Sequence, residues 1–245
     1  MRRSIRATTW VSPRSSRSGR GVASRTLRLA HRGDWRRAPE NSIAAFTAAL
    51  AIPACDGLEF DVRVSADGVP VICHDASLER THGRADRVDA LGAAALEALG
   101  VPTLADVLAM VGRHAFLDVE LKEVMGPVVV EMLAGARGPG LSNAVVSSFE
   151  VAALERVGHL APAWPRWLNS RTLTPSDIAT ALRIGCRGVA VQWRALDAGS
   201  VGQAHAAGLE VASYTVRRRS TFDRLVRLGV VAVCVEAGAL DGGDM

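Results

Sequence analysis

Residues 57–64 read GLEFDVRV, and residues 115–122 read AFLDVELK. In both stretches charged residues alternate with apolar ones, and alternate residues of a β-strand point to the same face of its sheet. The apolar face needs a cover of packed side chains, whereas the charged face collects several carboxylates. The two stretches therefore predict strands that are covered by helices on one face and carry polar groups on the other.

The same alternation of strand-like and helix-like patterns extends over residues 26–245. Predicted strands span residues 26–31, 57–64, 115–122, 143–149, 164–169, 187–192, 210–216 and 230–235. Predicted helices span residues 42–51, 104–111, 127–136, 151–157, 175–182, 200–207 and 220–228. Ser42 is placed to cap the first helix, and Thr103 with Asp106 to cap the second. Repeated β–α units with eight strands predict an α/β fold, a single (β/α)8 (TIM) barrel.

Residues 65–101 interrupt this alternation. They contain the turn Ala66-Asp67-Gly68, a short apolar run that ends in His74-Asp75, and a connection rich in Gly, Ala and Leu. We interpret them as a small insertion after the second strand that arches over the C-terminal mouth of the barrel. An open doubly wound sheet would give similar alternation, but it would carry a Gly-rich phosphate turn after its first strand. His31-Arg32-Gly33 is not such a turn.

The positive charge of the chain belongs to its N-terminus. The 245 residues carry a net charge of +4, yet residues 1–25 hold seven Arg and no acidic residue, so removing them leaves −3. We expect residues 1–25 to be a disordered, basic Arg/Ser-rich tail, because they contain too few apolar residues to fold. A tail with weak affinity for polyanions is the alternative. We expect residues 26–245 to be the barrel domain, without nucleic-acid binding by the barrel itself.

Hydropathy and cysteine spacing bear on the compartment of the protein. No apolar run approaches the ~20 residues that span a bilayer, so we expect no membrane span. The four Cys residues lie in apolar surroundings without C-x-x-C spacing. They predict reduced thiols and a cytoplasmic protein, and we expect a monomer or homodimer.

The charged face of the two strands predicts a metal site. Glu59, Asp61 and Glu120 would converge toward the barrel axis, where like charges cannot all ionise without a cation. Three carboxylates suit one divalent cation, Mg²⁺ or Ca²⁺, better than Zn²⁺. The alternative for each residue is a solvated or salt-bridged surface charge.

His31 and His74 stand at predicted strand ends in the same region, and together they suggest a general acid and a general base. Arg32 and Lys122 add the cationic donors that a phosphate group needs. The alternatives are packed or capping histidines and salt bridges to the same carboxylates. The remaining histidines, which lack such company, are predicted to be surface or packing residues: His82, His114, His159 and His205.

These motifs occur in one order along the chain. They are His31-Arg32-Gly33, Pro39-Glu40-Asn41-Ser42, Glu59-Phe60-Asp61-Val62, the run from Asp67 to Asp75, Leu78-Glu79-Arg80-Thr81, Val101-Pro102-Thr103-Leu104, Val119-Glu120-Leu121-Lys122 and Ser147-Ser148-Phe149. The chain resembles the glycerophosphodiester phosphodiesterases over about residues 27–240, and so many blocks in order are specific.

The resemblance implies a barrel with an insertion after its second strand and hydrolysis of small-molecule glycerophosphodiesters to sn-glycerol 3-phosphate and an alcohol. It also implies a divalent cation at Glu59, Asp61 and Glu120. Catalysis would be carried out by His31 and His74. Arg32 and Lys122 match phosphate-contacting positions. Two points stay open: whether the nucleophile is water or a neighbouring glycerol hydroxyl, and which histidine is the acid.

Two departures from the family pattern concern the substrate rim. Tyr214-Thr215-Val216-Arg217 stands where the family has Trp-Thr-Val-Asn, and Val235-Glu236 stands where it has Thr-Asp. We therefore expect Tyr214 and Arg217 to contact the substrate and to alter the alcohol specificity. Two other functions would use parts of the same pattern: a lipid-phosphodiester lyase, which would need an apolar membrane-facing rim, and a non-catalytic barrel that binds phosphodiesters.

Overall fold

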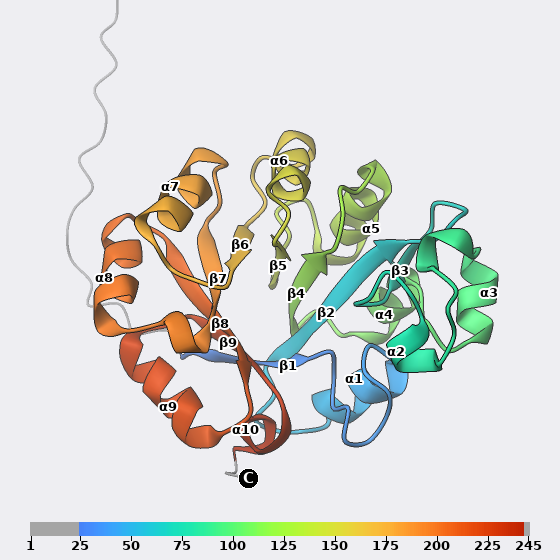
Figure 1. Ribbon diagram of the computed structural model, residues 1–245, viewed down its shortest axis with the longest axis horizontal. Helices are drawn as coiled ribbons and strands as arrows, with labels where there is room; N and C mark the ends of the chain where they lie inside the picture. The colour runs from blue at the N-terminus through green and yellow to red at the C-terminus, as the bar shows by residue number, and fades with distance from the viewer. Residues whose placement is uncertain (1–24, 243–245) are drawn as a thin grey trace, which may run out of the picture.

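The computed structural model describes residues 25–242, in which eight parallel strands surround a central axis and helices lie outside them (Figure 1). The sheet order is β1-β9-β8-β7-β6-β5-β4-β2-β3, and pairing of β1 with β2 closes the ring. The predicted (β/α)8 barrel is confirmed. Of the predicted N-terminal tail only Arg25 is described, so residues 1–24 lie outside the described residues.

Every predicted strand is present, with ends within two residues of the prediction. The barrel strands are β1 (Leu27–His31), β2 (Gly57–Val64), β4 (Phe116–Leu121), β5 (Ala144–Ser148), β6 (Arg166–Ser170), β7 (Gly188–Gln192), β8 (Glu210–Val216) and β9 (Ala232–Val235). Their alternating patterns place one set of side chains under the helices and the other inside the barrel.

The helices also follow the prediction. They are α1 (Ile43–Leu50), α4 (Leu104–Met110), α5 (Pro127–Arg137), α6 (Val151–Leu160), α7 (Pro175–Arg183), α8 (Ala198–Ala206) and α9 (Arg219–Leu228). Ser42 accepts a hydrogen bond from the Ala45 amide, and Thr103 and Asp106 form a reciprocal capping box, so both predicted caps are confirmed. Outside the insertion, two short elements were not predicted, the 3₁₀ turn η2 (Trp193–Ala195) and α10 (Ala237–Asp241).

Residues 65–101 form a small subdomain beside the barrel, at the right of Figure 1. It contains β3 (Pro70–Ile72), α2 (Glu79–His82), η1 (Val88–Ala90) and α3 (Ala93–Ala98). β3 pairs antiparallel with β2, which puts Ile72 opposite Val62. Val71, Leu78 and Leu96 are buried in a separate apolar cluster. The hairpin returns the chain to the barrel two residues before His74.

The barrel has an outer and an inner core. Outside the strands, Phe60 of β2 meets Phe46 of α1 with ring centroids 5.8 Å apart. Both rings are fully buried, and each contributes roughly 1.5–3 kcal/mol to stability. Inside the ring, a second cluster that includes Leu29, Val145 and Trp167 fills part of the barrel axis. The remaining interior, toward the carboxyl ends of the strands, is lined by polar groups.

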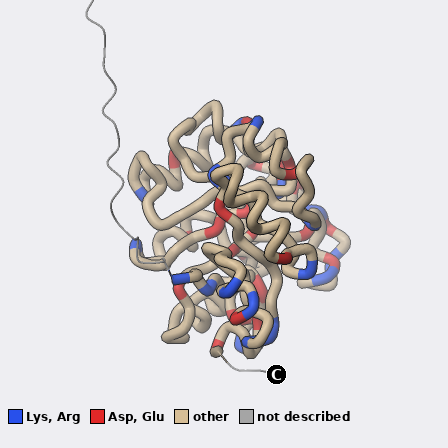
Figure 2. Tube along the Cα trace, turned by 90° about the vertical axis from the view of Figure 1, so that its left-hand side faces the viewer, with Lys and Arg blue, Asp and Glu red and all other residues tan. Residues whose placement is uncertain are grey.

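Figure 2 shows the chain from the side, with acidic and basic positions close to one another along much of the trace.

Among the described residues, no helix is long and apolar enough to cross a bilayer. All four Cys thiols are free, and Cys73, Cys186 and Cys234 are buried.

Candidate active site

The turn after β1 presents the first two predicted site residues. Arg32 adopts a left-handed backbone with φ 56°, a conformation that is uncommon for residues other than glycine and often found at functional sites. Gly33 follows with φ 83°, and a Cβ atom there would lie 2.7 Å from the carbonyl carbon of Ala45. Only glycine fits this close approach to α1, so the turn fixes where His31 and Arg32 point.

The predicted metal ligands converge, as the strand register requires. Asp61 of β2 is paired with Glu120 of β4, and Glu59 lies two residues before Asp61 on the same face. Glu59, Asp61 and Glu120 are 3%, 0% and 9% exposed, and one oxygen from each lies within 4.8 Å of the others. Both carboxylate oxygens of Glu59 are buried without a hydrogen-bond partner. Buried polar atoms without partners are rare and costly, which favours a ligand for them.

Burial and repulsion control the charge of this cluster. Burial, together with Asp61 and Glu120, raises the pKa of Glu59 well above its usual range. Burial and Asp61 likewise raise the pKa of Glu120. Burial acts in the same direction on Asp61, but Lys122 and Arg32 hold the pKa of Asp61 well below its usual range. Without a further cation, the three carboxylates cannot all carry their negative charge.

The two predicted phosphate-contacting cations lie against the cluster. Arg32 Nε is 3.0 Å from Asp61 Oδ2, and Arg32 Nη1 donates to Glu40 Oε1 at 3.0 Å. Lys122 Nζ is 2.9 Å from Asp61 Oδ1 and also contacts Glu120. The salt bridges considered as an alternative are thus present, and both cations still line the cavity described below.

His31 is held between two glutamates. Its Nδ1 atom lies 2.6 Å from Glu236 Oε1, and its Nε2 atom lies 3.8 Å from Glu59 Oε2. The Nε of Arg217 donates to the other oxygen of Glu236 at 2.7 Å. Burial acts to raise the pKa of Glu236, but hydrogen bonds from His31 and Arg217 lower it to about 2. An ionised Glu236 holds the proton of His31 on Nδ1 and leaves Nε2 facing the cluster.

His74 is held in a similar way on the loop after β3. Its Nδ1 atom lies 2.7 Å from Asp75 Oδ1. Its backbone carbonyl accepts two hydrogen bonds from the Arg63 guanidinium, at 3.0 and 2.8 Å. Burial lowers the pKa of His74, so its imidazole is neutral near pH 7. Each predicted histidine therefore has a carboxylate at Nδ1, a contact that orients the ring.

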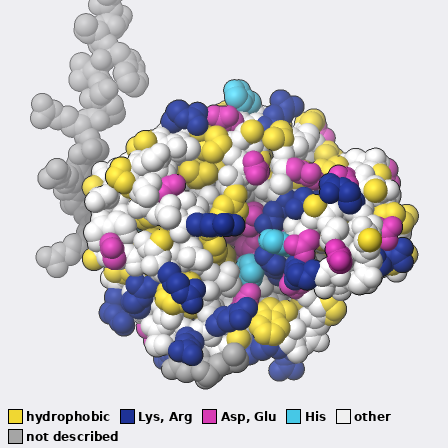
Figure 3. Space-filling view, in the orientation of Figure 1, with side chains coloured by type: hydrophobic (Ala, Val, Ile, Leu, Met, Phe, Trp, Pro, Cys, Tyr) yellow, Lys and Arg dark blue, Asp and Glu magenta, His cyan; other side chains and the backbone are white. Residues whose placement is uncertain are grey.

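A cavity of about 280 Å³ brings these groups together at the carboxyl ends of the strands. Figure 3 shows this face, where histidine and basic side chains surround a central hollow with acidic side chains inside it. Seven of the nine predicted site residues line the cavity: His31, Arg32, Glu59, His74, Glu120, Lys122 and Tyr214. Asp61 is fully buried against the side chains of Arg32 and Lys122.

The two predicted substrate-rim residues are placed differently. Tyr214 lines the cavity, donates a hydrogen bond from its hydroxyl to the Ser170 carbonyl at 2.7 Å, and meets the Phe149 ring edge-on at 5.8 Å. Arg217 does not line this cavity. It lies on the neighbouring one, where its Nε is bound to Glu236.

Three site residues were not assigned a role from the sequence. Asp118 lines the cavity, and burial raises its pKa to about 7. Its spacing of two from Glu120 was the available signal. Asn41 donates from Nδ2 to Asp61 Oδ2 at 2.8 Å, and its position in a family motif pointed to it. Glu236 was noted only as a departure on the rim, because its contact with His31 spans 205 residues of chain.

Comparisons with known proteins identify relatives of this chain. A model of the glycerophosphoryl diester phosphodiesterase family matches residues 31–237. A glycerophosphodiester phosphodiesterase of Caldanaerobacter subterraneus is 27% identical, over 86% of this chain and 94% of its own. One from Bacillus subtilis is 28% identical, over 91% and 88% of the two chains.

Solved structures share the fold. An Oleispira antarctica phosphodiesterase in complex with the product sn-glycerol-3-phosphate aligns with a TM-score of 0.71 at 25% identity, covering 86% of this chain and 93% of that one. A glycerophosphodiester phosphodiesterase from Thermotoga maritima aligns at 0.74 and 20% identity, covering 88% and 96%. The family model spans most of the barrel and includes every residue of the site described above. The chain belongs to the glycerophosphoryl diester phosphodiesterase family.

Proposed function

We propose that this protein hydrolyses glycerophosphodiesters to sn-glycerol 3-phosphate and an alcohol, with one bound divalent cation and with His31 and His74 as its acid–base pair. Family membership supports the reaction class. The main support for these residue roles is the arrangement of side chains around the catalytic cavity. Two histidines with carboxylates at Nδ1 lie with two cations around a carboxylate cluster whose Glu59 oxygens have no partner.

The residues present fit a hard divalent cation. Glu59, Asp61 and Glu120 offer only oxygen atoms, which Mg²⁺ and Ca²⁺ prefer, and we propose one of these two ions. When bound there, such an ion neutralises charge on phosphate oxygens and acts as a Lewis acid. A positive charge at this place would also allow Glu59 and Glu120 to ionise, which burial and repulsion otherwise oppose.

The protein's own groups account for the proton transfers. With Nδ1 directed to a carboxylate, each histidine has Nε2 available to a substrate in the cavity. One imidazole accepts the proton of the attacking hydroxyl, and the other donates a proton to the departing alkoxide. Arg32 and Lys122 contact the charge on the phosphoryl oxygens and exchange their present carboxylate partners for it. Tyr214 would pack against the organic part of the substrate.

The rim argues against a lipid-phosphodiester lyase. Such an enzyme needs an apolar surface that contacts a membrane, whereas here the exposed rings of Trp35 and Phe149 stand near arginines. Arg217 lies 6.0 Å from the Trp35 ring, and Arg171 lines the same cavity as Phe149. A rim that mixes rings with cations suits a water-soluble, charged substrate.

One assay tests the proposal. Purified protein is incubated with glycerophosphocholine and either Mg²⁺ or Ca²⁺, with and without a chelator, and the products are separated. The proposal predicts sn-glycerol 3-phosphate and choline, lost with chelator and restored by the ion. A cyclic glycerophosphate as the final product would favour the lyase. Unchanged turnover in chelator would reject the cation, and no turnover of any glycerophosphodiester would reject the proposed function.

A further inference from the structure

A second cavity opens beside the catalytic one on the same end of the barrel. It has a volume of about 590 Å³, compared with about 280 Å³ for the catalytic cavity. The two share a wall formed by the ends of β7 and β8: Gln192, Tyr214 and Thr215. A substrate that extends past this wall therefore enters the second cavity.

The second cavity is lined by positive charge. Arg194, Arg217 and Arg218 line it, and none of the other described residues that line it is acidic. Residues 26–245 carry a net charge of −3, so this concentration of arginine runs against the average of the folded part. Across the described part of the chain, neither Arg194 nor Arg218 has an ion pair with a carboxylate. Arg217 uses its Nε on Glu236, but its side chain is 66% exposed.

An aromatic ring orders one of these cations. The guanidinium carbon of Arg194 lies 4.2 Å from the centroid of the Trp193 ring. Arg224 flanks the same ring at 5.7 Å and is anchored by hydrogen bonds to the carbonyls of Leu196 and Trp193. A guanidinium that stacks on a ring keeps its N–H edge for an anion and loses less entropy on binding. Arg194 is therefore a cation whose position is set, and none of its donors has a hydrogen-bond partner among residues 25–242.

We propose that the cavity lined by Arg194, Arg217 and Arg218 binds a second phosphate of the substrate. The preferred substrates would then be glycerophosphodiesters that carry another phosphate group beyond the scissile one. This inference rests on the proposed function and names its substrate class. The planar donor edge of arginine matches phosphate oxygens, and three arginines without a lining acid favour an anion over a neutral or cationic group. Glycerophosphocholine, whose alcohol is a cation, would be hydrolysed with a lower kcat/KM than such a substrate.

The test compares two substrates that differ by one phosphate. They are glycerophosphoglycerol and its monophosphate, in which a free primary hydroxyl carries phosphate. We expect wild type to prefer the monophosphate by about tenfold in kcat/KM, since a charge-assisted hydrogen bond contributes about that factor. Added NaCl should shrink the preference, because salt screens exposed charges. Equal kcat/KM for the two substrates would overturn the inference while leaving the proposed function intact.

Variants locate the effect. The double variant Arg194→Gln, Arg218→Gln should lose most of the preference, whereas Arg156→Gln, which removes an exposed charge from α6, should retain it. A preference that persists in the double variant would overturn the assignment of this cavity. Calorimetric binding of both substrates to a His31→Ala, His74→Ala protein provides a readout independent of turnover. Tighter binding of the monophosphate without any hydrolysis by wild type would retain the subsite and reject the proposed reaction.

Discussion

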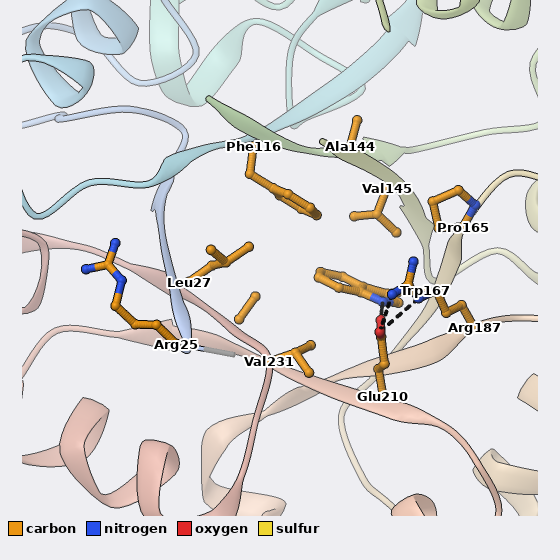
Figure 4. A pocket seen from close by; sticks show the side chains of 11 residues that line it. Arg25, Leu27, Phe116, Ala144, Val145, Pro165, Trp167, Arg187, Glu210 and Val231 are labelled. Atoms are coloured by element: carbon orange, nitrogen blue, oxygen red, sulfur yellow. Dashed lines mark hydrogen bonds and ion pairs between the residues drawn. The ribbon is translucent and has the colours of Figure 1, made fainter. Parts of the chain in front are cut away.

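Carboxylates at the two ends of the barrel differ in whether neighbouring groups satisfy them. At the amino ends of the strands, Glu210 accepts hydrogen bonds from Trp167 Nε1 at 3.4 Å and Arg187 Nε at 2.8 Å (Figure 4). The Phe116 ring stacks on Trp167 at 6.1 Å. At the carboxyl ends, Glu59 is more deeply buried than Glu210, yet neither of its carboxylate oxygens has a hydrogen-bond partner.

This difference in hydrogen bonding distinguishes a carboxylate that stabilises the fold from one that is available to a ligand. A polar group that serves the fold is satisfied by neighbours within the protein, as Glu210 is, because an unpaired buried group destabilises the native state. We propose that the carboxylates left unsatisfied at the mouth bind a ligand that the chain does not itself supply. In barrels of this kind, the carboxyl ends carry chemistry and the amino ends carry stability. Substitutions at the two ends should therefore have opposite consequences.

The largest effect is expected at the histidines. His31→Ala or His74→Ala should lower kcat by about 10²–10⁴, with little change in melting temperature, because each removes a proton-transfer group from an open cavity. The double variant should be far less impaired than the product of the two singles, since both serve one reaction. Steady-state kinetics give kcat, and thermal melts of the same samples give the melting temperature. His159→Ala on α6, which lies on the surface, is the control.

At the opposite end, Trp167→Ala should destabilise the fold by about 3–5 kcal/mol, because it opens a cavity in the inner core. The substitution also removes the hydrogen bond that Trp167 Nε1 donates to Glu210. Turnover per folded molecule should stay normal. Urea unfolding and kcat corrected for the folded fraction test this. A loss of kcat with unchanged stability would contradict the claim that the amino ends of the strands serve stability and not catalysis.

A smaller effect is expected where Glu236 holds His31. Glu236→Gln keeps the size of the side chain but weakens the hydrogen bond that orients the imidazole, so kcat should fall by roughly tenfold with KM nearly unchanged. Glu236→Asp should recover part of the loss. Measurements of kcat and KM for both variants test whether Glu236 orients His31. If both behave like wild type, Glu236 serves only to anchor Arg217.

The smallest effect is a pH dependence of stability. Burial raises the pKa of Asp118 to about 7 and raises that of Glu59, so the cation-free folded protein keeps protons that the unfolded chain loses near pH 4. This contribution to stability is present below pH 4 and is lost as pH rises through 7. A bound cation replaces those protons, so Mg²⁺ or Ca²⁺ should raise the melting temperature by a few degrees more at pH 8 than at pH 6. An equal rise at both values would contradict the assignment.

The fold was predictable because each barrel strand has its own local pattern. Glu59 and Asp61 alternate with apolar neighbours, and this alternation alone placed β2. Strand β3 was missed as a strand because three residues, Pro70–Ile72, are too few to show a period. The start of β6 was predicted two residues early, since Trp164 is as buried as the strand residue Trp167.

The site was predictable where its residues share a strand or a strand end, and less so elsewhere. Spacing alone placed Glu59 with Asp61, and parallel strands brought Glu120 beside them. Contacts between the first and the last strand have no such local signal. The hydrogen bond between His31 and Glu236 depends on closure of the barrel, which pairs β1 with β9 and sets Ala30 opposite Val235, and the ion pair of Arg217 uses the same Glu236.

The central claim is that the unsatisfied carboxylates at the mouth bind a catalytic cation. Calorimetric titration of Mg²⁺ and Ca²⁺ into wild type and Glu59→Gln, with kcat measured on the same preparations, tests it directly. The account predicts one cation per wild-type chain. It also predicts at least about tenfold weaker binding in Glu59→Gln, with kcat that falls at low cation and partly recovers at high cation. Equal cation affinity and equal kcat in the two proteins would show that the cluster is a structural polar network.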